Sequence, residues 1–206
     1  MMSERGDGSP LTPEDSRPLD RESPVIYTIG HSTRSLDEFV GLLGAHRVRR
    51  LGDIRTVPRS RRHPHFAIEA LSVSLPRAGI AYRHFPGLGG LRKPRADSPN
   101  TAWRHSGFRG YADYMATSAF EEAIEQLLVF ASASASGGFE GGAPRTAIMC
   151  AEAVWWRCHR QLAADALVAR GVEVRHISTD RAAPPHELTD FARVNDGKVS
   201  YPSLIR

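Results

Sequence analysis

The chain has 206 residues, a formal charge of +4 at pH 7 and a pI of about 9.4, and 41% of its residues are hydrophobic and 24% charged. This composition excludes disorder throughout, and the length favours one well-buried domain. No apolar run approaches the roughly 20 residues of a membrane helix, and the amino terminus lacks the apolar stretch of a secretion signal. We therefore expect a cytoplasmic protein that does not bind membranes.

Residues 1–23 are rich in Ser, Pro and charged side chains and nearly free of large apolar ones, which predicts a disordered tail before a single domain over 24–206. Within this domain, apolar and β-branched runs predict strands at 25–29, 48–54, 80–85, 146–150 and 172–177. Apolar residues at helical spacing predict helices at 36–43, 68–78, 110–115, 118–130 and 157–170. Ser35 and Glu38 have the spacing of a capping box before the first helix.

Two segments interrupt this alternation of strands and helices. Residues 86–106 carry glycines, prolines and basic side chains, which predicts an insertion loop, and residues 131–144 form a low-complexity flexible link rich in Gly, Ser and Ala. The alternation predicts an α/β fold in a single domain, with a mainly parallel β-sheet of about five strands and helices on both faces.

Polar side chains follow three of the predicted strands where each strand ends. These segments are Gly30-His31-Ser32-Thr33, Asp53-Ile54-Arg55 and Cys150-Ala151-Glu152. Because parallel strands end at one edge of a sheet, we expect the three segments to converge there, where α/β folds bind ligands. This convergence is the central prediction.

The loop at His31 has features of an anion site. Ser32 and Thr33 are small hydroxyl residues before a helix amino terminus, and Asp53 and Arg55 follow a neighbouring strand. Arginine suits bidentate binding of phosphate or carboxylate, so an anionic small molecule or nucleic acid is the expected partner. The alternative is that Ser32 and Thr33 serve only the helix start and that the arginines form a solvated surface.

Both cysteines of the chain lie in one short polar segment. It contains Cys150, Glu152, Arg157, Cys158, His159 and Arg160. We expect Cys158 in the first turn of the helix, where the helix dipole and the neighbouring arginines favour a thiolate. Glu152 could act as a general base, and His159 or His31 could transfer a proton near neutral pH. The alternative is that the cysteines are small buried hydrophobic residues.

Zinc binding is a competing interpretation of the same segment. Cys150, Cys158, His159 and His31 would supply four ligands of the kind that zinc accepts. The spacing differs from paired Cys-x-x-Cys zinc motifs, so no metal is favoured and no resident cofactor is expected in the preferred interpretation.

Aromatic residues occur beside the basic insertion. Tyr111 and Tyr114, together with Trp103 and Phe108, could stack on the bases of a single-stranded nucleic acid. The alternative, for aromatic residues at helical spacing, is packing in the core.

Five ordered motifs carry a resemblance to a known family. They are Tyr27-Thr-Ile-Gly-His31-Ser32, Asp53-Ile-Arg55 with Pro58-Arg59-Ser60, Leu88-Gly89-Gly90, Phe108-Arg-Gly-Tyr111-Ala-Asp-Tyr114-Met, and Cys150-Ala-Glu152 with Cys158-His159-Arg160. From about residue 25 to 178 the chain resembles DUF488, a domain-of-unknown-function family. The resemblance implies a single α/β domain with an enzyme-like polar site in a bacterial or archaeal cytosolic protein, and it implies no particular reaction. The pair Trp155-Trp156 and the glycine-rich link before Pro144 look like departures from the family.

Three hypotheses follow for the function. The first is an enzyme acting on an anionic, phosphate-containing substrate such as a nucleotide or nucleic acid. Its reactive thiol is Cys158 or Cys150, and Arg55, Arg157 and Arg160 hold the anion. The second is a noncatalytic nucleic-acid-binding module, and the third is a domain stabilised by zinc.

Overall fold

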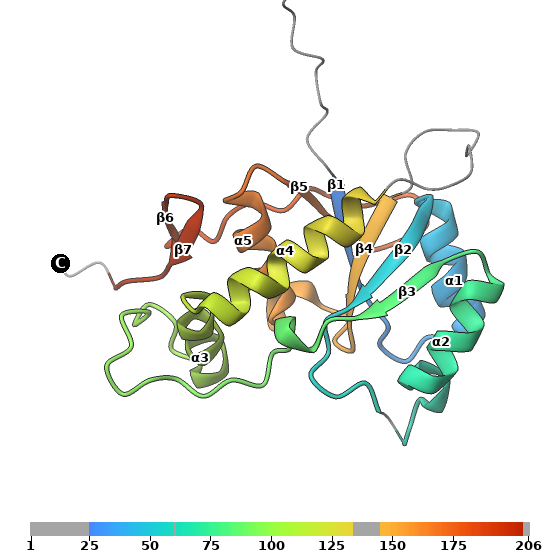
Figure 1. Cartoon of the computed structure of the whole chain (residues 1–206), viewed down its shortest axis with the longest axis horizontal. Coiled ribbons are helices and arrows are strands. Elements are labelled where there is room, and N and C mark those ends of the chain that lie inside the picture. The colour runs from blue at the N-terminus through green and yellow to red at the C-terminus, as the bar shows by residue number, and fades with distance from the viewer. Residues whose placement is uncertain (1–24, 60, 134–144, 204–206) are drawn as a thin grey trace, which may run out of the picture.

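The computed structural model describes residues 25–59, 61–133 and 145–203 (Figure 1). The predicted tail at 1–23 and most of the predicted link at 131–144 lie outside these residues. The main sheet contains β1 (Val25–Gly30), β2 (Val48–Asp53), β3 (Ala81–His84), β4 (Arg145–Cys150) and β5 (Glu173–His176). The helices are α1 (Leu36–Ala45), α2 (Ile68–Arg77), α3 (Ser106–Met115), α4 (Ser118–Ser132) and α5 (Arg160–Val168).

The strand order in the sheet is β3-β2-β4-β1-β5, and every neighbouring pair is parallel. From β1 the chain moves through β2 to β3 on one side, and it then returns to β4 and continues to β5 on the other side. Reversing the direction of a right-handed crossover moves its helix to the opposite face of the sheet. The α/β fold with helices on both faces, predicted from sequence, is confirmed.

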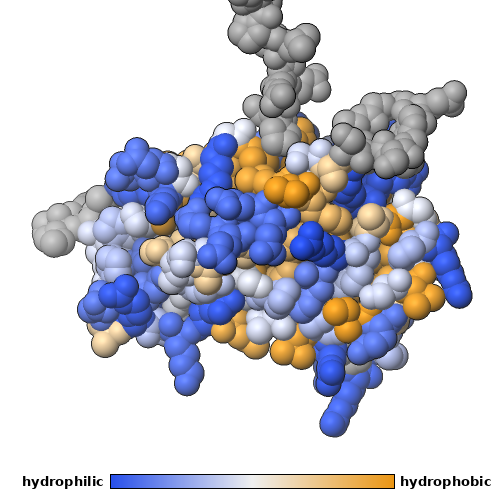
Figure 2. All heavy atoms as spheres, viewed as in Figure 1, coloured by the Kyte–Doolittle hydropathy of each residue, from blue (hydrophilic) through white to orange (hydrophobic). Residues whose placement is uncertain are grey.

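Two hydrophobic clusters fill the space between the sheet and the two helix layers. On one face, α1 and α2 contribute Phe39, Leu43, Leu71 and Leu75, all fully buried. On the other face, α4 and α5 pack over Ile148 and the other side chains that point to that side, and α3 packs against α4 and α5 beside the sheet. Each fully buried large apolar side chain contributes about 1.5–3 kcal/mol to folding. The surface in Figure 2 is mostly hydrophilic, with scattered hydrophobic groups, as is usual for a globular protein.

Some boundaries differ from the prediction. Helix α3 begins at Ser106 instead of residue 110, because the ring of His105 caps it by accepting a hydrogen bond from the backbone of Gly107. Helix α5 begins at Arg160 instead of residue 157, since Trp155–Arg157 form a separate 3-10 turn. The polar tail contains an unpredicted hairpin of β6 (Arg193–Asn195) and β7 (Lys198–Ser200).

No helix in the described ranges is long and apolar enough to cross a bilayer.

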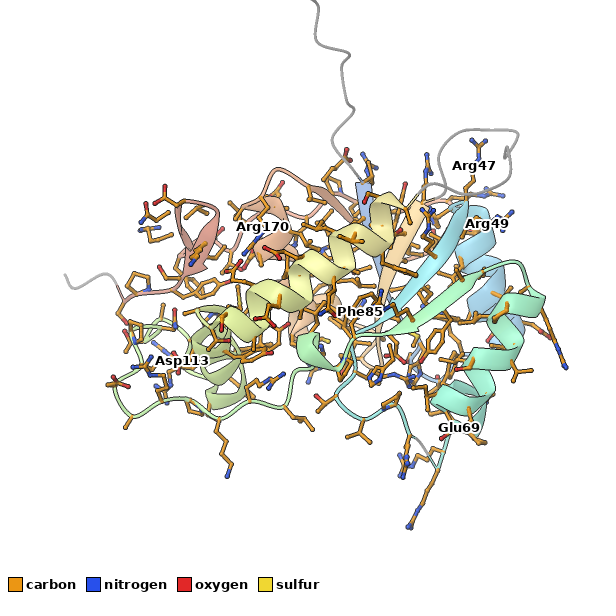
Figure 3. The ribbon with its side chains drawn as sticks, in the orientation of Figure 1. Arg47, Arg49, Glu69, Phe85, Asp113 and Arg170 are labelled. Atoms are coloured by element: carbon orange, nitrogen blue, oxygen red, sulfur yellow. The ribbon has the colours of Figure 1, made fainter. Side chains whose placement is uncertain are left out.

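The predicted insertion at 86–106 starts with a 3-10 turn, Pro86–Leu88, and is fastened to helix α3 by Asp113 (Figure 3). The Asp113 carboxylate accepts hydrogen bonds from the backbone of Arg95 at 2.8 Å, from the hydroxyl of Ser98 at 2.5 Å and from the amide of Asn100 at 2.8 Å. A buried carboxylate with three donors holds the loop in one conformation.

A buried hydrogen-bond chain joins α5 and the tail to the sheet. Asp165, which is fully buried, accepts from the Tyr201 hydroxyl at 2.7 Å and contacts the His186 Nε2 atom at 2.8 Å. The other His186 nitrogen lies 2.9 Å from His176 Nε2, and His176 Nδ1 lies 2.7 Å from the Thr28 hydroxyl. This chain ends on β1, so it connects the carboxyl-terminal tail to an interior strand of the sheet.

The His176 ring is expected to make the protein less stable in acid. Burial, followed by electrostatic interactions with His186 and Arg160, lowers the pKa of His176 from 6.5 to about 3. The unfolded chain therefore binds a proton below pH 6.5 that the folded protein excludes, and the free energy of unfolding falls as the pH drops from 6.5 toward 3. At about 1.4 kcal/mol per pKa unit, the part of the loss between pH 7 and pH 5 that His176 causes should be about 2 kcal/mol.

Urea unfolding at pH 7 and pH 5 measures this loss. The variant His176→Gln lacks the titrating ring and should lose less stability between the two pH values than the unmodified protein. Equal losses in both proteins would contradict the assignment to His176.

Candidate active site

Three strands of the sheet end side by side, as predicted. Gly30 is paired with Cys150 across β1 and β4, and Asp53 is paired with Met149 across β2 and β4. The pairing continues beyond the strands, because the backbone N–H of His31 donates to the Cys150 carbonyl at 3.0 Å. The central prediction of convergence at one edge is therefore confirmed.

Gly30 permits the close approach of the loop that follows β4. A Cβ atom at position 30 would lie 1.9 Å from the carbonyl oxygen of Glu152, well inside any tolerable contact. The absence of a side chain thus lets the segment 150–153 cross over the end of β1.

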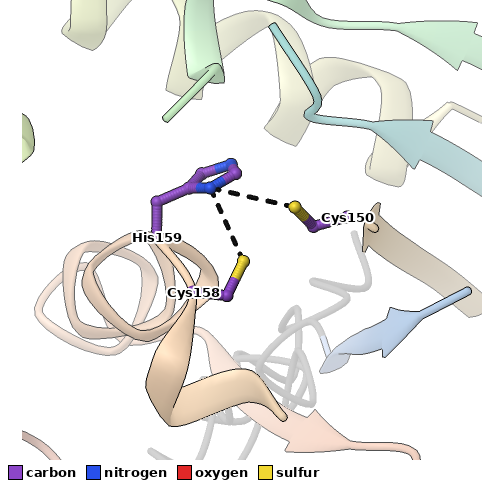
Figure 4. Close-up of side chains that lie close together, drawn as sticks. All are labelled: Cys150, Cys158 and His159. Carbon is purple, nitrogen blue, oxygen red and sulfur yellow. Dashed lines mark hydrogen bonds between the residues drawn. The ribbon is translucent and has the colours of Figure 1, made fainter. Parts of the chain in front are cut away.

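Cys150, Cys158 and His159 form a compact group, called here the Cys–Cys–His trio (Figure 4). The Nδ1 atom of His159 lies 3.5 Å from the Cys158 sulfur and 3.9 Å from the Cys150 sulfur. The Nε2 atom of the same ring lies 3.0 Å from the carbonyl oxygen of Ile54. Because a carbonyl only accepts hydrogen bonds, we assign the ring proton to Nε2, so the lone pair of Nδ1 faces both sulfurs.

Cys158 does not lie in the first turn of α5, and this correction to the sequence prediction has a local cause. The 3-10 turn at Trp155–Arg157 delays the helix, which begins only at Arg160. A hydrogen bond from Cys150, together with the charge and hydrogen bonds of Arg160, outweighs burial and lowers the pKa of Cys158 to about 6. The hydrogen bond to Cys158, together with burial, raises the pKa of Cys150 to about 12.

The trio lines a cavity of about 620 Å³. Glu152, Arg157 and His105 provide its charged and titratable groups besides the trio and Arg55. Its rim also carries large apolar side chains that are unusually exposed, namely Val57 at 60%, Leu91 at 79% and Trp156 at 57%. The cavity therefore offers buried soft donor atoms, charged groups and an apolar rim to one bound molecule.

Gly90 makes room for the histidine of the trio. A Cβ atom at position 90 would lie 2.3 Å from Nδ1 of His159. The substitution Gly90→Ala should therefore displace the ring and lower the free energy of unfolding by about 1–3 kcal/mol, as overpacking usually does.

The matched control for this prediction is Gly41→Ala. A Cβ atom there has nothing within 4 Å, and the position lies inside helix α1, where alanine is more favourable than glycine by about 0.5–1 kcal/mol. Urea unfolding should show opposite signs for the two variants. A stable Gly90→Ala protein would refute the close packing of His159.

His31, Asp53 and Arg55 form a buried set next to the cavity. The Arg55 guanidinium contacts the Asp53 carboxylate at 2.9 and 2.5 Å and donates to the Phe66 carbonyl at 2.8 Å. His31 contacts the Ser32 carbonyl through Nδ1 and the Arg55 guanidinium through Nε2. Burial is the main reason that the pKa of His31 falls to about 4, so the ring is neutral at pH 7.

This placement changes two roles expected of His31. Both ring nitrogens are already bonded, so the ring supports Arg55 and is not poised to transfer protons near neutral pH. The structure also does not bring His31 into the group of residues that could hold a metal, which consists of Cys150, Cys158 and His159.

A second hollow of about 400 Å³ adjoins the first. It contains Ser32 and Thr33 together with Arg59 and His63, and both hollows are lined by Glu152. The predicted capping box at Ser35 is present, so the hydroxyl of Ser35 serves helix α1.

Three other predicted substrate-binding residues face the protein interior. Arg160 is 1% exposed and donates to the carbonyl oxygens of Glu152 and Ala153. The Tyr111 hydroxyl donates to the Leu88 carbonyl, and the Tyr114 hydroxyl donates to a carbonyl in the same 3-10 turn. These side chains hold the loops around the cavity, and none of them lines it.

Several residues that line the cavity were not assigned from sequence, among them Val57, Leu91, His105 and Trp156. They lie in loops far from the cysteines in the chain or, for Trp156, in the unpredicted 3-10 turn. Exposed apolar side chains show no periodicity, so their common position could not be found from sequence pattern.

The fold and the cavity together define a single-domain α/β protein with a polar site at the carboxyl edge of a parallel sheet. Residues 35–167, well over half of the chain, match the family described as Domain of unknown function DUF488, and the chain belongs to this family. The family resemblance predicted from the five motifs is thus confirmed. No curated protein and no solved structure matches the chain.

Proposed function

We propose that the protein is an enzyme that acts on an anionic, phosphate-containing substrate bound in the 620 Å³ cavity. The observation that carries the proposal is that the Cys–Cys–His trio and the exposed cation of Arg157 line the same cavity. Buried soft donor atoms at a cavity are typical of a reaction centre, and a cation at the rim would orient a charged substrate over them.

Arg157 is the best placed anion-binding residue. Its guanidinium takes part in no ion pair within the described part of the chain, whereas the charge of Arg55 is neutralised by Asp53. An exposed guanidinium can bind two oxygens of a phosphate at once. The exposed carboxylate of Glu152 would serve as the general acid or base.

The apolar rim favours a substrate with a flat, apolar part. Trp156 is 57% exposed at the cavity, and stacking of a base on an aromatic side chain contributes about 1–3 kcal/mol. A phosphate group and a heterocyclic ring together describe a nucleotide. The free cysteines fit a reducing compartment, which supports a cytoplasmic location.

A calorimetric titration tests this function. Adenosine monophosphate should bind the full chain, and Arg157→Ala should weaken its binding about tenfold or more, since a hydrogen-bonded charge contributes about 1.5–3 kcal/mol. Arg77→Ala, in the last turn of α2, is the control and should have no effect. Absence of binding, or equal affinities in the unmodified protein and Arg157→Ala, would refute the proposed site.

Catalysis is tested separately by incubating the protein with a panel of nucleotides and phosphate esters and analysing the products. Turnover should depend on Glu152 and on the trio, and Glu152→Gln should reduce it about 100-fold or more. Binding of nucleotides without any turnover would exclude an enzyme of this type.

A noncatalytic nucleic-acid-binding module is the second candidate, and one observation favours it. Arg59, Arg61 and Arg62 are exposed in the loop beside the second hollow. If phosphate contacts dominate, the affinity for a single-stranded oligonucleotide should fall steeply as salt rises. An affinity that does not change with salt would exclude this candidate.

A further inference from the structure

We infer that the Cys–Cys–His trio is a zinc site with three protein ligands and a fourth coordination position open to the cavity. The ligand set stands on the geometry of Cys150, Cys158 and His159 alone. The role of the open position rests on the function proposed above, because the substrate would enter through the same cavity.

The distances within the trio match those of a tetrahedral zinc site. Zinc binds sulfur at about 2.3 Å and imidazole nitrogen at about 2.0 Å, which places a sulfur and a nitrogen ligand about 3.5 Å apart on a tetrahedron. The two observed sulfur–nitrogen distances are 3.5 and 3.9 Å, and all three donor atoms lie within 4.8 Å of one another. A metal ion would need only a small movement of Cys150.

The histidine is oriented as a ligand. Its Nε2–H donates to the Ile54 carbonyl at 3.0 Å, which leaves the lone pair of Nδ1 directed at the sulfurs. Zinc-binding histidines commonly donate their second N–H to a carbonyl or carboxylate in this way. The missing side chain at Gly90 leaves the ring the space it occupies.

The surroundings of Cys158 also suit a metal-bound thiolate. The positive charge of Arg160 acts on Cys158, and the guanidinium that carries it is anchored by the carbonyl oxygens of the 150–153 loop. A charged group that is itself held by hydrogen bonds fixes the surroundings of a ligand before the metal arrives. The site is therefore preorganised by β2, β4 and the start of α5.

The fourth position faces the cavity. No fourth His, Cys, Asp or Glu joins the trio among the residues that the structure describes, while all three members line the 620 Å³ cavity. Structural zinc sites are closed by four protein ligands, whereas catalytic sites keep one position for water or substrate. The geometry thus points to a zinc site of the catalytic kind, with one position open to water or substrate.

A metal titration of the full chain, kept reduced and stripped with a chelator, tests the ligand set. Zinc alone is added in competition with a chromophoric chelator, and we expect one tightly bound ion per chain. Cys150→Ser, Cys158→Ser and His159→Ala should each lower the zinc affinity at least 100-fold, whereas His105→Ala, which alters another cavity residue, should leave it unchanged. Circular dichroism spectra identify any variant that fails to fold.

Gly90→Ala provides a second variant that keeps all three ligands but displaces His159, and it should weaken zinc binding about tenfold or more. If the unmodified reduced protein takes up no zinc, or if the thiols form a disulfide that persists under reducing conditions, the inference is overturned. Zinc that remains bound to all three ligand variants would overturn it equally.

Cobalt(II) in place of zinc tests the open position. The thiolate-to-cobalt absorption and the visible bands should indicate four-coordination, and added azide should change them by replacing the water at the fourth position. Bands that azide leaves unchanged would show a closed site and would overturn the open position. Both readouts are independent of nucleotide binding, so a protein that binds zinc but no adenosine monophosphate would contradict the proposed function without contradicting the zinc site.

Discussion

Replacing Asp53 with Asn is expected to lower the free energy of unfolding by about 3–5 kcal/mol, the usual loss when one partner of a buried ion pair is removed. The Asp53 carboxylate is fully buried and accepts hydrogen bonds from Arg55 and from the Tyr82 hydroxyl. Asparagine keeps the shape but removes the charge, which leaves the guanidinium of Arg55 at 6% exposure without its counter-charge.

The matched control is Asp97→Asn. Its partner Arg95 is 61% exposed and Asp97 itself is 72% exposed, so the loss should stay below about 1 kcal/mol. Urea unfolding of both variants at pH 7 measures the difference. Similar losses of stability at the two positions would show that the buried Asp53–Arg55 pair next to the cavity does not stabilise the protein.

Replacing Asp165 with Ala should destabilise the protein by a similar amount, about 3–5 kcal/mol. Its carboxylate is fully buried and accepts from the Tyr201 hydroxyl and from both the backbone and the hydroxyl of Thr189, while it also contacts His186. Alanine would leave these buried groups without a partner, and each unsatisfied group costs about 1–3 kcal/mol.

The variant should also loosen the carboxyl-terminal tail. Limited proteolysis followed by mass spectrometry should detect faster cleavage within residues 187–203 than in the unmodified protein. Asp180→Ala is the control, since that carboxylate is 67% exposed and lies 3.9 Å from Arg181. A tail that remains equally resistant in Asp165→Ala would contradict its attachment through this carboxylate.

The fold could be predicted because buried parallel strands carry continuous apolar sequence. Val25–Gly30 and Arg145–Cys150 are recognisable in this way, and the parallel arrangement alone requires their polar ends to meet. The convergence of Cys150, Asp53 and the His31 loop follows from the apolar pattern of the strands and from the alternation of strands and helices. It needs no knowledge of side-chain contacts.

The directions of individual side chains could not be predicted by the same means. Arg160 looks like an anion-binding residue from its position at a helix start, yet its long side chain turns inward to the carbonyls of the preceding loop. Tyr111 and Tyr114 lie beside basic residues in the chain, but the Tyr111 ring is buried in the core and the partly buried Tyr114 ring packs against it. Which face of a short helix is buried depends on the elements that pack against it.

The hydrogen bonds between Asp165 and the carboxyl-terminal tail were also not predicted from sequence. Asp165 is a charged residue among alanines and leucines of a buried helix, and a carboxylate in that position needs partners. Its partners lie 21 to 36 residues further along the chain, in a segment without periodic apolar positions. Sequence could have indicated a buried network at Asp165, but not which tail residues complete it.

The proposed function requires that the protein bind its substrate in the cavity over the Cys–Cys–His trio. The most direct measurement is a titration of the full ¹⁵N-labelled chain with adenosine monophosphate, followed through the backbone amide chemical shifts. We predict that the largest changes occur at residues 55–57, 90–91, 150–152 and 156–159, which line the cavity. Changes concentrated around Arg145, Arg175 and Arg181, which line a separate hollow at the opposite end of the sheet, would contradict the account.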